Sequence, residues 1–171
     1  MARYLALTAA LGVLALGACG KSQQSNAPEA PAAPSEPASA PAPAALTDTQ
    51  KKTLLAELPA AYQAADLGNG EAKFAVCAAC HTTAQGGADM TGPNLWGIFG
   101  RKAGSEASFN YSDDLKGAGW TWDADHIDKW ITNPRAVLPG TKMTFLGLAE
   151  ANDRRDVVAY LKVSTSPPPA S

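Results

Sequence analysis

Leucines recur at a helical spacing between Leu46 and Ala65. Leu54, Leu55 and Leu58 fall on one face of a helix. Thr47 or Asp48 is suited to cap its N-terminus, and Pro59 interrupts it. The pattern predicts a short amphipathic helical extension over residues 46–65. We expect it to pack against the rest of the domain; the alternative is that it binds a partner.

A longer region with helical patterning follows, from about Asp66 to Lys162. It predicts a first helix capped by Asn69, with Phe74 and Val76 as apolar positions, and then a loop over 82–104. A short helix is predicted over 112–116. The next helix is capped by Thr121 or Asp123 and ends at Asn133-Pro134, and the last is opened by Asn152 or Asp153. Ile127, Trp130 and Ile131 share one face, as do Val157, Tyr160 and Leu161. No segment shows sustained period-two alternation, so the fold class predicted is all-α.

The first residues have the pattern of an export signal. Arg3 precedes an apolar stretch of about fifteen residues, too short for a confident membrane-spanning helix. Leu16-Gly17-Ala18-Cys19 resembles the bacterial lipobox, in which the cysteine receives a lipid. We expect residues 1–18 to be a lipoprotein signal peptide and Cys19 to be lipidated. The alternative is an ordinary signal peptide with a chance cysteine.

Differences in amino-acid composition separate a linker, a main domain and a C-terminal tail. Residues 19–45 are dominated by Ala, Pro and Ser, which favours an extended linker. At about 3.1 Å per residue it could reach at most roughly 80 Å. Residues 66–163 form the predicted main domain, and the Ser/Pro-rich residues 164–171 are expected to be a disordered tail.

Charge and cysteine content exclude several classes of protein. The formal net charge is −2 and the pI is about 5.6, so the basic stripe of a nucleic-acid-binding protein is absent. Three cysteines, an odd number, do not indicate a disulfide framework.

Cys77-Ala78-Ala79-Cys80-His81 is the strongest chemical signal. Two thiols three residues apart can each add across one vinyl group of the same haem, and the adjacent histidine then becomes an axial ligand of its iron. A structural zinc site would need more ligands at similar spacing, and a thioredoxin-like dithiol would not need His81. The motif predicts one covalent haem c.

The second axial ligand has three candidates. Met90 is too close to His81 in sequence to reach the opposite face of a haem easily. His126 lies on a helix with many charges, where a solvated surface histidine is expected. Met143 follows Pro139-Gly140-Thr141-Lys142, an irregular loop suited to presenting a thioether, which favours Met143.

Taken together, these motifs resemble class I cytochrome c, in particular its mitochondrial-type branch and membrane-anchored bacterial relatives. The resemblance spans roughly residues 69–162 and rests on Cys77–His81, Thr91-Gly92-Pro93-Asn94-Leu95-Trp96-Gly97-Ile98-Phe99-Gly100-Arg101-Lys102, Asn133-Pro134, Pro139-Gly140-Thr141-Lys142-Met143 and Asp156-Val157-Val158-Ala159-Tyr160-Leu161-Lys162.

The resemblance implies roles for individual residues. Met143 would be the distal ligand, and Thr141 belongs to the same haem-binding loop. The Pro93 carbonyl would accept the Nδ1 proton of His81. Three residues would bond to or lie near the haem propionates: Arg101, Tyr111 and Trp122. Gly70 and Phe74 would meet Tyr160 where the first and last helices of the domain cross.

Two positions depart from the family pattern. Trp130 stands where a tyrosine near the methionine sulfur is usual, and Leu115 aligns with a position that is often asparagine. We expect both changes to thin the polar network around Met143.

The resemblance implies an electron carrier rather than an enzyme. We expect a monomer that carries electrons from a quinol–cytochrome c reductase to a cytochrome oxidase. It is expected to be lipid-anchored on the periplasmic side of a bacterial inner membrane; the outer membrane is the alternative, because Gly20 and not an aspartate follows Cys19. One alternative is a dedicated acceptor or donor of a periplasmic dehydrogenase or reductase. Another is a haem peroxidase or gas sensor with a displaceable Met143. Arg101, Lys102, Arg135 and Lys142 are candidates for a local basic ring or for a solvated face.

Overall fold

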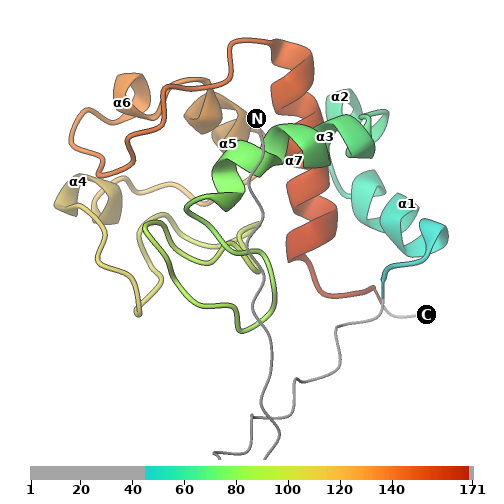
Figure 1. Cartoon of the computed structure of the whole chain (residues 1–171), viewed down its shortest axis with the longest axis horizontal. Coiled ribbons are helices and arrows are strands. Elements are labelled where there is room, and N and C mark those ends of the chain that lie inside the picture. Colours follow the sequence, from blue (N-terminus) through green and yellow to red (C-terminus); the bar gives the residue numbers. More distant parts are fainter. Residues whose placement is uncertain (1–44, 170–171) are drawn as a thin grey trace, which may run out of the picture. The chain divides into compact units, whose positions relative to one another are not determined.

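A computed structural model describes residues 45–169, and the lipobox with Cys19 and most of the linker lie outside this range. The chain forms seven helices there, joined by irregular loops (Figure 1). Their bounds are α1 Asp48–Ala56, α2 Ala60–Gln63, α3 Leu67–Ala78, α4 Asp113–Lys116, α5 Ala124–Thr132, α6 Pro134–Val137 and α7 Ala151–Thr165. The only bridge between extended residues in this range joins Lys102 and Thr121, so the fold is all-α. Within residues 45–169, no helix combines the length and hydrophobicity needed to cross a bilayer.

Helix α3 crosses α7 at close range (Figure 1). A Cβ built on Gly70 would lie 2.2 Å from the Asp156 carbonyl oxygen, so only glycine permits this approach. The rings of Phe74 and Tyr160 pack beside it with centroids 5.4 Å apart. The predicted meeting of Gly70 and Phe74 with Tyr160 is confirmed. Of the two apolar positions predicted for this helix, Phe74 is buried, whereas Val76 is 58% exposed.

The cap of α3 is also different from the prediction. Asp66 accepts hydrogen bonds from the backbone N–H groups of Gly68 and Asn69. Asn69 donates instead to the Asp153 and Asp156 carboxylates of α7. The prediction of Asn69 as the cap is therefore wrong; an aspartate is as good an N-cap as an asparagine, and Asp66 begins the helix three residues earlier.

The extension packs on α7 as part of the same core. Leu54 and Leu58 are buried, and α1 and α2 both contact α7. The Glu57 carboxylate pairs with Lys162 of α7 at 2.6 Å, and the Tyr62 hydroxyl donates to Asp125 of α5 at 3.1 Å. Thr47 caps α1 in a capping box, one of the two caps that the sequence offered.

The C-terminal helix is longer than predicted at both ends. It begins at Ala151, before Asn152, and continues to Thr165. Thr165 is fully buried; its hydroxyl donates to the Leu161 carbonyl, and its own carbonyl accepts from the Gly97 N–H. The prediction of a disordered tail from Ser164 is therefore wrong for residues 164–166, because this tertiary contact outweighs the local Ser/Pro composition.

Candidate functional site

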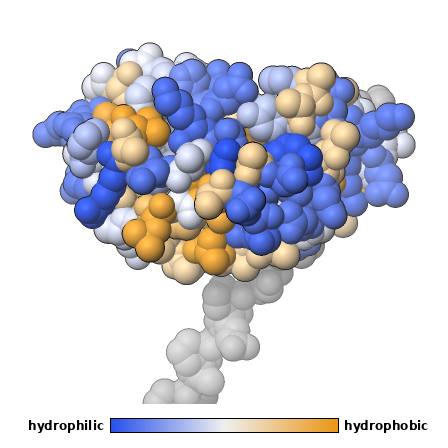
Figure 2. Space-filling view, turned by 90° about the horizontal axis from the view of Figure 1, so that it is seen from above, coloured by the Kyte–Doolittle hydropathy of each residue, from blue (hydrophilic) through white to orange (hydrophobic). Residues whose placement is uncertain are grey.

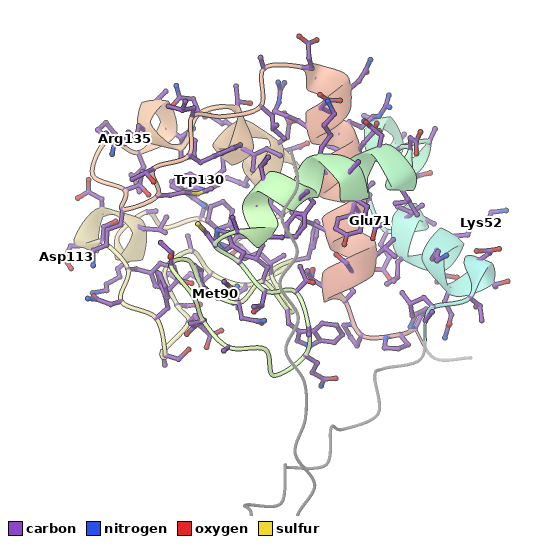
Figure 3. The ribbon with its side chains drawn as sticks, viewed as in Figure 1. Lys52, Glu71, Met90, Asp113, Trp130 and Arg135 are labelled. Carbon is purple, nitrogen blue, oxygen red and sulfur yellow. The ribbon has the colours of Figure 1, made fainter. Side chains whose placement is uncertain are left out.

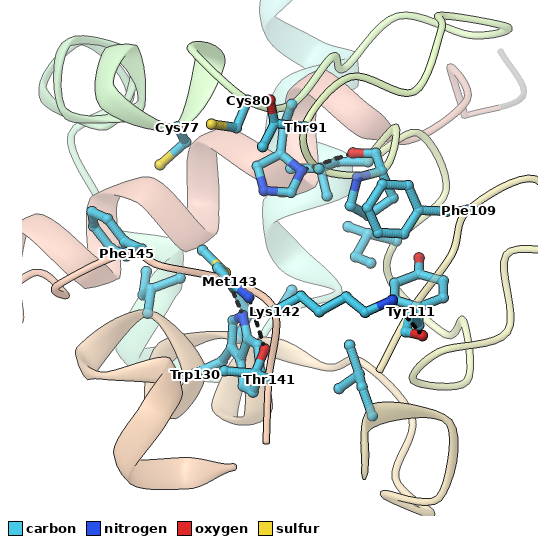
Figure 4. Close-up of a pocket in the computed structure, with 18 of the residues that line it drawn as sticks. Cys77, Cys80, Thr91, Phe109, Tyr111, Trp130, Thr141, Lys142, Met143 and Phe145 are labelled. Atoms are coloured by element: carbon cyan, nitrogen blue, oxygen red, sulfur yellow. Dashed lines mark hydrogen bonds between the residues drawn. The ribbon is translucent and has the colours of Figure 1, made fainter. Parts of the chain in front are cut away.

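An apolar pocket of about 360 Å³ lies at the C-terminal end of α3 (Figure 4). It brings together nine of the residues that the sequence singled out. Cys77 and Trp130 lie in helices α3 and α5, and the others lie in loops: Cys80, His81, Pro93, Tyr111, Trp122, Thr141 and Met143. Leu95, Ile98, Leu115, Ile127, Ile131 and Leu161 supply much of the hydrophobic lining. A pocket of this kind suits a large, flat, mostly apolar ligand.

Both thiols of the C-x-x-C-H motif border this pocket. Cys77 is the eleventh residue of α3, and Cys80 follows the end of the helix, where its N–H donates to the Cys77 carbonyl. Burial, together with the nearby Cys80, raises the pKa of the Cys77 thiol to about 11. Neither thiol forms a disulfide. The spacing therefore presents two reduced sulfurs to one ligand.

His81 is oriented by a single backbone contact. Its Nδ1 lies 2.8 Å from the Pro93 carbonyl oxygen, which fits an Nδ1 proton and leaves Nε2 free to bind a metal. Burial lowers the pKa of His81 more than this hydrogen bond raises it. The ring is therefore held in the neutral form that ligation requires.

Gly92 shapes the space around that ring. A Cβ at Gly92 would lie 2.3 Å from Cε1 of His81, so a side chain there would displace the imidazole. The Gly92 N–H donates to the Cys80 carbonyl at 2.9 Å, which binds this loop to the cysteine motif. Sequence reasoning quoted Gly92 only as part of a motif and assigned it no role.

Met143 lies across the pocket from Cys77 and Cys80 (Figure 4). Its backbone N–H donates to the Thr141 hydroxyl at 3.2 Å. The Lys142 ammonium donates to the backbone carbonyls of Asn110 and Tyr111, at 2.8 and 3.3 Å. These bonds hold the 139–143 loop in place, and no sequence signal pointed to the role of Lys142.

Trp130 contacts the methionine sulfur directly. Its indole Nε1–H donates to Sδ of Met143 at 3.1 Å (Figure 4). The expectation that Trp130 thins the polar network is therefore wrong, because an indole N–H supplies a donor just as a phenol does. For Leu115 the expectation agrees with the structure, since this buried side chain adds only apolar surface to the pocket.

The residues predicted near the propionates divide into two groups. Tyr111 and Trp122 are buried and line the pocket, and burial raises the pKa of the Tyr111 phenol. Arg101 is not brought to the pocket. Its guanidinium pairs with Glu106 at 2.8 Å and donates to the Asn94 carbonyl at 2.9 Å.

The other candidate ligands do not line this pocket. Met90 is 50% exposed. The His126 ring stacks on Trp120 and pairs with Asp123 at 2.8 Å on the surface. Of the three candidates from the sequence, the structure brings only Met143 to the pocket.

The residues present fit a haem. Two neighbouring thiols, a neutral imidazole with a free nitrogen and a thioether face one apolar cavity. The absence of a side chain at Gly92 leaves room for the imidazole. This is the donor set of a covalently attached haem with histidine and methionine ligands.

Known proteins agree with this interpretation. The family model described as cytochrome c matches residues 67–165. Cytochrome c2 of Rhodomicrobium vannielii is 46% identical over 101 residues, which cover 59% of this chain and 81% of that protein. Cytochrome c of Chlamydomonas reinhardtii is 43% identical over 104 residues, covering 60% and 93% of the two chains.

A solved structure gives the same result. Cytochrome cH from Methylobacterium extorquens aligns with a TM-score of 0.53 and 40% identity, covering 57% of this chain and 97% of that chain. The chain therefore belongs to the cytochrome c family and is a monohaem electron carrier with one covalent haem c, not an enzyme.

Proposed function

We propose that this protein is a membrane-tethered carrier of single electrons with histidine and methionine axial ligands. The observation that supports it best is the presence of His81 and Met143 in one apolar pocket whose rim holds Cys77 and Cys80. Bound haem supplies one-electron chemistry at its iron.

Each side chain has a role in this proposal. Cys77 and Cys80 would form the thioether links to the haem, and His81, held by the Pro93 carbonyl, would bind the iron through Nε2. Met143 would bind the iron through its thioether, a soft and neutral donor that favours the reduced state. Tyr111 and Trp122 line the pocket and would lie near the haem propionates. Thr141 holds the Met143 backbone.

A methionine held this firmly disfavours the peroxidase or gas-sensor alternative. Trp130 and Thr141 both bond to Met143, and Lys142 fastens the same loop to residues 110 and 111. Moving the thioether aside to open a coordination position would break its hydrogen bond from Trp130, while the other two contacts hold the loop in place.

The tether is supported by the sequence. Cys19 follows a lipobox-like stretch, and a linker rich in Ala and Pro separates it from the domain. A domain on such a linker stays concentrated near membrane partners. We propose that it carries electrons from a quinol–cytochrome c reductase to a cytochrome oxidase on the periplasmic side of the inner membrane. The second candidate, service to a periplasmic dehydrogenase or reductase, uses the same site.

Membrane fractionation combined with respiration tests the proposal. Wild-type protein should sediment with membranes and support quinol-driven oxidase turnover. Cys19→Ser protein should bind haem normally, appear in the soluble fraction and support less turnover at the same low total concentration. Equal turnover by the two proteins would contradict the tethered shuttle, and soluble wild-type protein would contradict the lipid anchor.

A further inference from the structure

Three of the four tryptophans of the chain pack against one another beside Met143. The ring centroids of Trp122 and Trp130 are 5.5 Å apart, those of Trp120 and Trp122 are 5.8 Å apart, and those of Trp120 and Trp130 are 6.4 Å apart. Such separations are typical of aromatic rings in direct contact. We call these three residues the tryptophan cluster.

The inner end of the cluster lies at the haem pocket. The indole Nε1–H of Trp130 donates to Sδ of Met143 at 3.1 Å (Figure 4). Trp130 and Trp122 are both buried and both line the pocket. Solvent therefore has little access to this end of the cluster.

The outer end of the cluster reaches the surface. The half-buried Trp120 stacks on the His126 ring, with centroids 5.9 Å apart and an angle of 16° between the ring planes. The His126 side chain is 43% exposed, and its Nδ1 lies 2.8 Å from the exposed Asp123 carboxylate. Figure 2 shows hydrophilic side chains beside hydrophobic ones over one face of the domain, so water-soluble reagents can approach that surface. Aromatic rings thus connect the Met143 sulfur with solvent.

Packing alone does not account for an indole at Trp120. Its Nε1 is buried and has no hydrogen-bond partner among residues 45–169. A buried N–H without a partner costs free energy, and a phenylalanine in the same place would avoid that cost. What an indole offers in return is an electron that is removed far more easily than one from a phenyl ring.

The surroundings of the two ends favour a positive charge on Trp120 over one on Trp130. The Asp123 carboxylate is bonded to the His126 ring that stacks on Trp120, and a nearby negative charge stabilises a cationic ring. Trp130 is buried, where a charge is poorly solvated. Its N–H faces a thioether, a weak acceptor, and the Trp120 N–H has no acceptor among the described residues. Both indoles would therefore keep their protons when they lose an electron.

We propose that the tryptophan cluster carries electrons from the surface to Met143 and so protects this sulfur from oxidation. A one-electron oxidant such as the sulfate radical takes an electron from the Met143 sulfur and becomes sulfate. Trp130 gives an electron to the sulfur and receives one through the cluster, which leaves Trp120 as a radical cation. Ascorbate then reduces Trp120, becomes the ascorbyl radical and releases its own proton to water. Only electrons move within the protein, and no bond in it is broken.

This protective role goes beyond the proposed function. Oxidation of a methionine to its sulfoxide turns a soft sulfur donor into a polar group. At Met143 it would remove the thioether that the proposed site needs. The oxidised form of an electron carrier has no electron of its own to give, so electrons supplied from the surface matter most in that form.

The test uses the full haem-loaded chain in its oxidised form with Cys19→Ser, which removes the only thiol outside the C-x-x-C-H motif. Flash photolysis of persulfate generates sulfate radicals. Tryptophan radicals are followed by freeze-quench electron paramagnetic resonance, and oxidised residues are then located by peptide mass spectrometry. The cluster is interrupted by Trp120→Phe or by Trp130→Phe.

The chain offers two matched controls. Trp96 is half-buried like Trp120, but it pairs with no aromatic ring among the described residues, so Trp96→Phe removes a tryptophan and leaves the cluster intact. Met90 is an exposed methionine that lies apart from Trp130 in Figure 3, so its oxidation reports the dose of oxidant in the same molecules.

Trp120→Phe should raise the Met143 sulfoxide at least about threefold and leave the Met90 sulfoxide unchanged. A role limited to the hydrogen bond on the sulfur would not give this result, because Trp130 and not Trp120 makes that bond. Trp130→Phe should lower the oxidation of Trp120, since electrons no longer pass from Trp120 to the sulfur. In the protein with all four tryptophans, ascorbate should shorten the life of the tryptophan radical.

Three results would overturn the proposal. The first is a Met143 sulfoxide level in Trp120→Phe no higher than in Trp96→Phe. The second is undiminished Trp120 oxidation in Trp130→Phe, which would mean that the oxidant attacks Trp120 directly. The third, which needs no variant, is a tryptophan radical whose lifetime ascorbate does not change. Each can occur while the haem spectrum and membrane-driven turnover stay normal, so failure here is distinguishable from failure of the proposed function.

Discussion

The indole Nε1–H of Trp130 donates a hydrogen bond to Sδ of Met143 at 3.1 Å. A donor on this sulfur withdraws electron density from it and would make it a weaker ligand for oxidised iron in the proposed site. The contact therefore favours the reduced state and also fixes the thioether rotamer.

Trp130→Phe keeps an aromatic ring but removes this donor. Its midpoint potential should fall by about 20–60 mV, the equivalent of a hydrogen bond worth about 0.5–1.5 kcal/mol for a one-electron couple. Spectroelectrochemical titration measures the change. Trp120→Phe is the matched control, because the buried Trp120 Nε1 has no hydrogen-bond partner among the described residues. An equal shift in both variants would contradict a specific effect of the contact.

Two glycines of α3 should respond in opposite ways to alanine. At Gly70 a Cβ would lie 2.2 Å from the Asp156 carbonyl oxygen, whereas at Gly68 the nearest atom is an Asp66 side-chain oxygen at 3.3 Å, which needs to shift by only a few tenths of an ångström. Gly70→Ala should destabilise the haem-loaded protein by at least about 2 kcal/mol. Gly68→Ala should be neutral or stabilising, because alanine is the better helix former. Guanidinium unfolding measures both, and equal losses would contradict the close crossing of α3 and α7.

The helical extension over residues 46–65 should stabilise the whole domain, because its buried leucines belong to the hydrophobic core. Leu58 is 5% exposed, so Leu58→Ala should cost about 2–4 kcal/mol of unfolding free energy. Lys52→Ala on the exposed side of α1 should change it by less than about 0.5 kcal/mol. If Leu58→Ala were equally mild, residues 46–65 would be loosely attached, and binding of a partner would become the better explanation for them.

Asp156 should make stability depend on pH in the acid range. Burial would raise the pKa of this carboxyl, but hydrogen bonds from Asn69, Arg155 and the Asp66 N–H outweigh burial and hold the pKa below its ordinary 3.8. Its contribution is therefore fully present above the unfolded pKa and is lost as the pH falls through the lower folded pKa.

Asp156→Asn should therefore lose about 1–3 kcal/mol at pH 7, and its difference from wild type should shrink below pH 3.8. Unfolding curves between pH 2 and pH 7 measure this. Asp113→Asn is the control, since that side chain is 99% exposed, and it should have little effect. A deficit that stayed constant with pH would rule out a role for the charge.

Much of the site could be predicted because its chemistry is local. The C-x-x-C-H motif needs only adjacent residues on one helix end, and the loop before Met143 is marked by Pro139 and Gly140. The short helix at 112–116 and the cap at Asp123 also follow from side chains that bond their own backbone.

Features that depend on distant partners could not be predicted. Ser164 and Thr165 have tail-like composition, yet Gly97 binds the Thr165 carbonyl and extends α7. Arg101 has the charge expected near a propionate, but Glu106 and Asn94 hold it elsewhere. In the sequence, Trp130 departs from the family's usual tyrosine, and only the structure shows that its indole N–H donates to the Met143 sulfur.

Absorption spectroscopy of the haem-loaded chain tests the central claim, that Met143 is the distal ligand opposite His81. Ferric wild-type protein should show the weak far-red band of methionine sulfur bound to iron, beside the usual c-type alpha band of the reduced form. Met143→Ala should lose the far-red band and keep the covalent haem, whereas Met90→Ala should retain both. A wild-type spectrum without the far-red band, or a Met143→Ala spectrum that still shows it, would contradict the account.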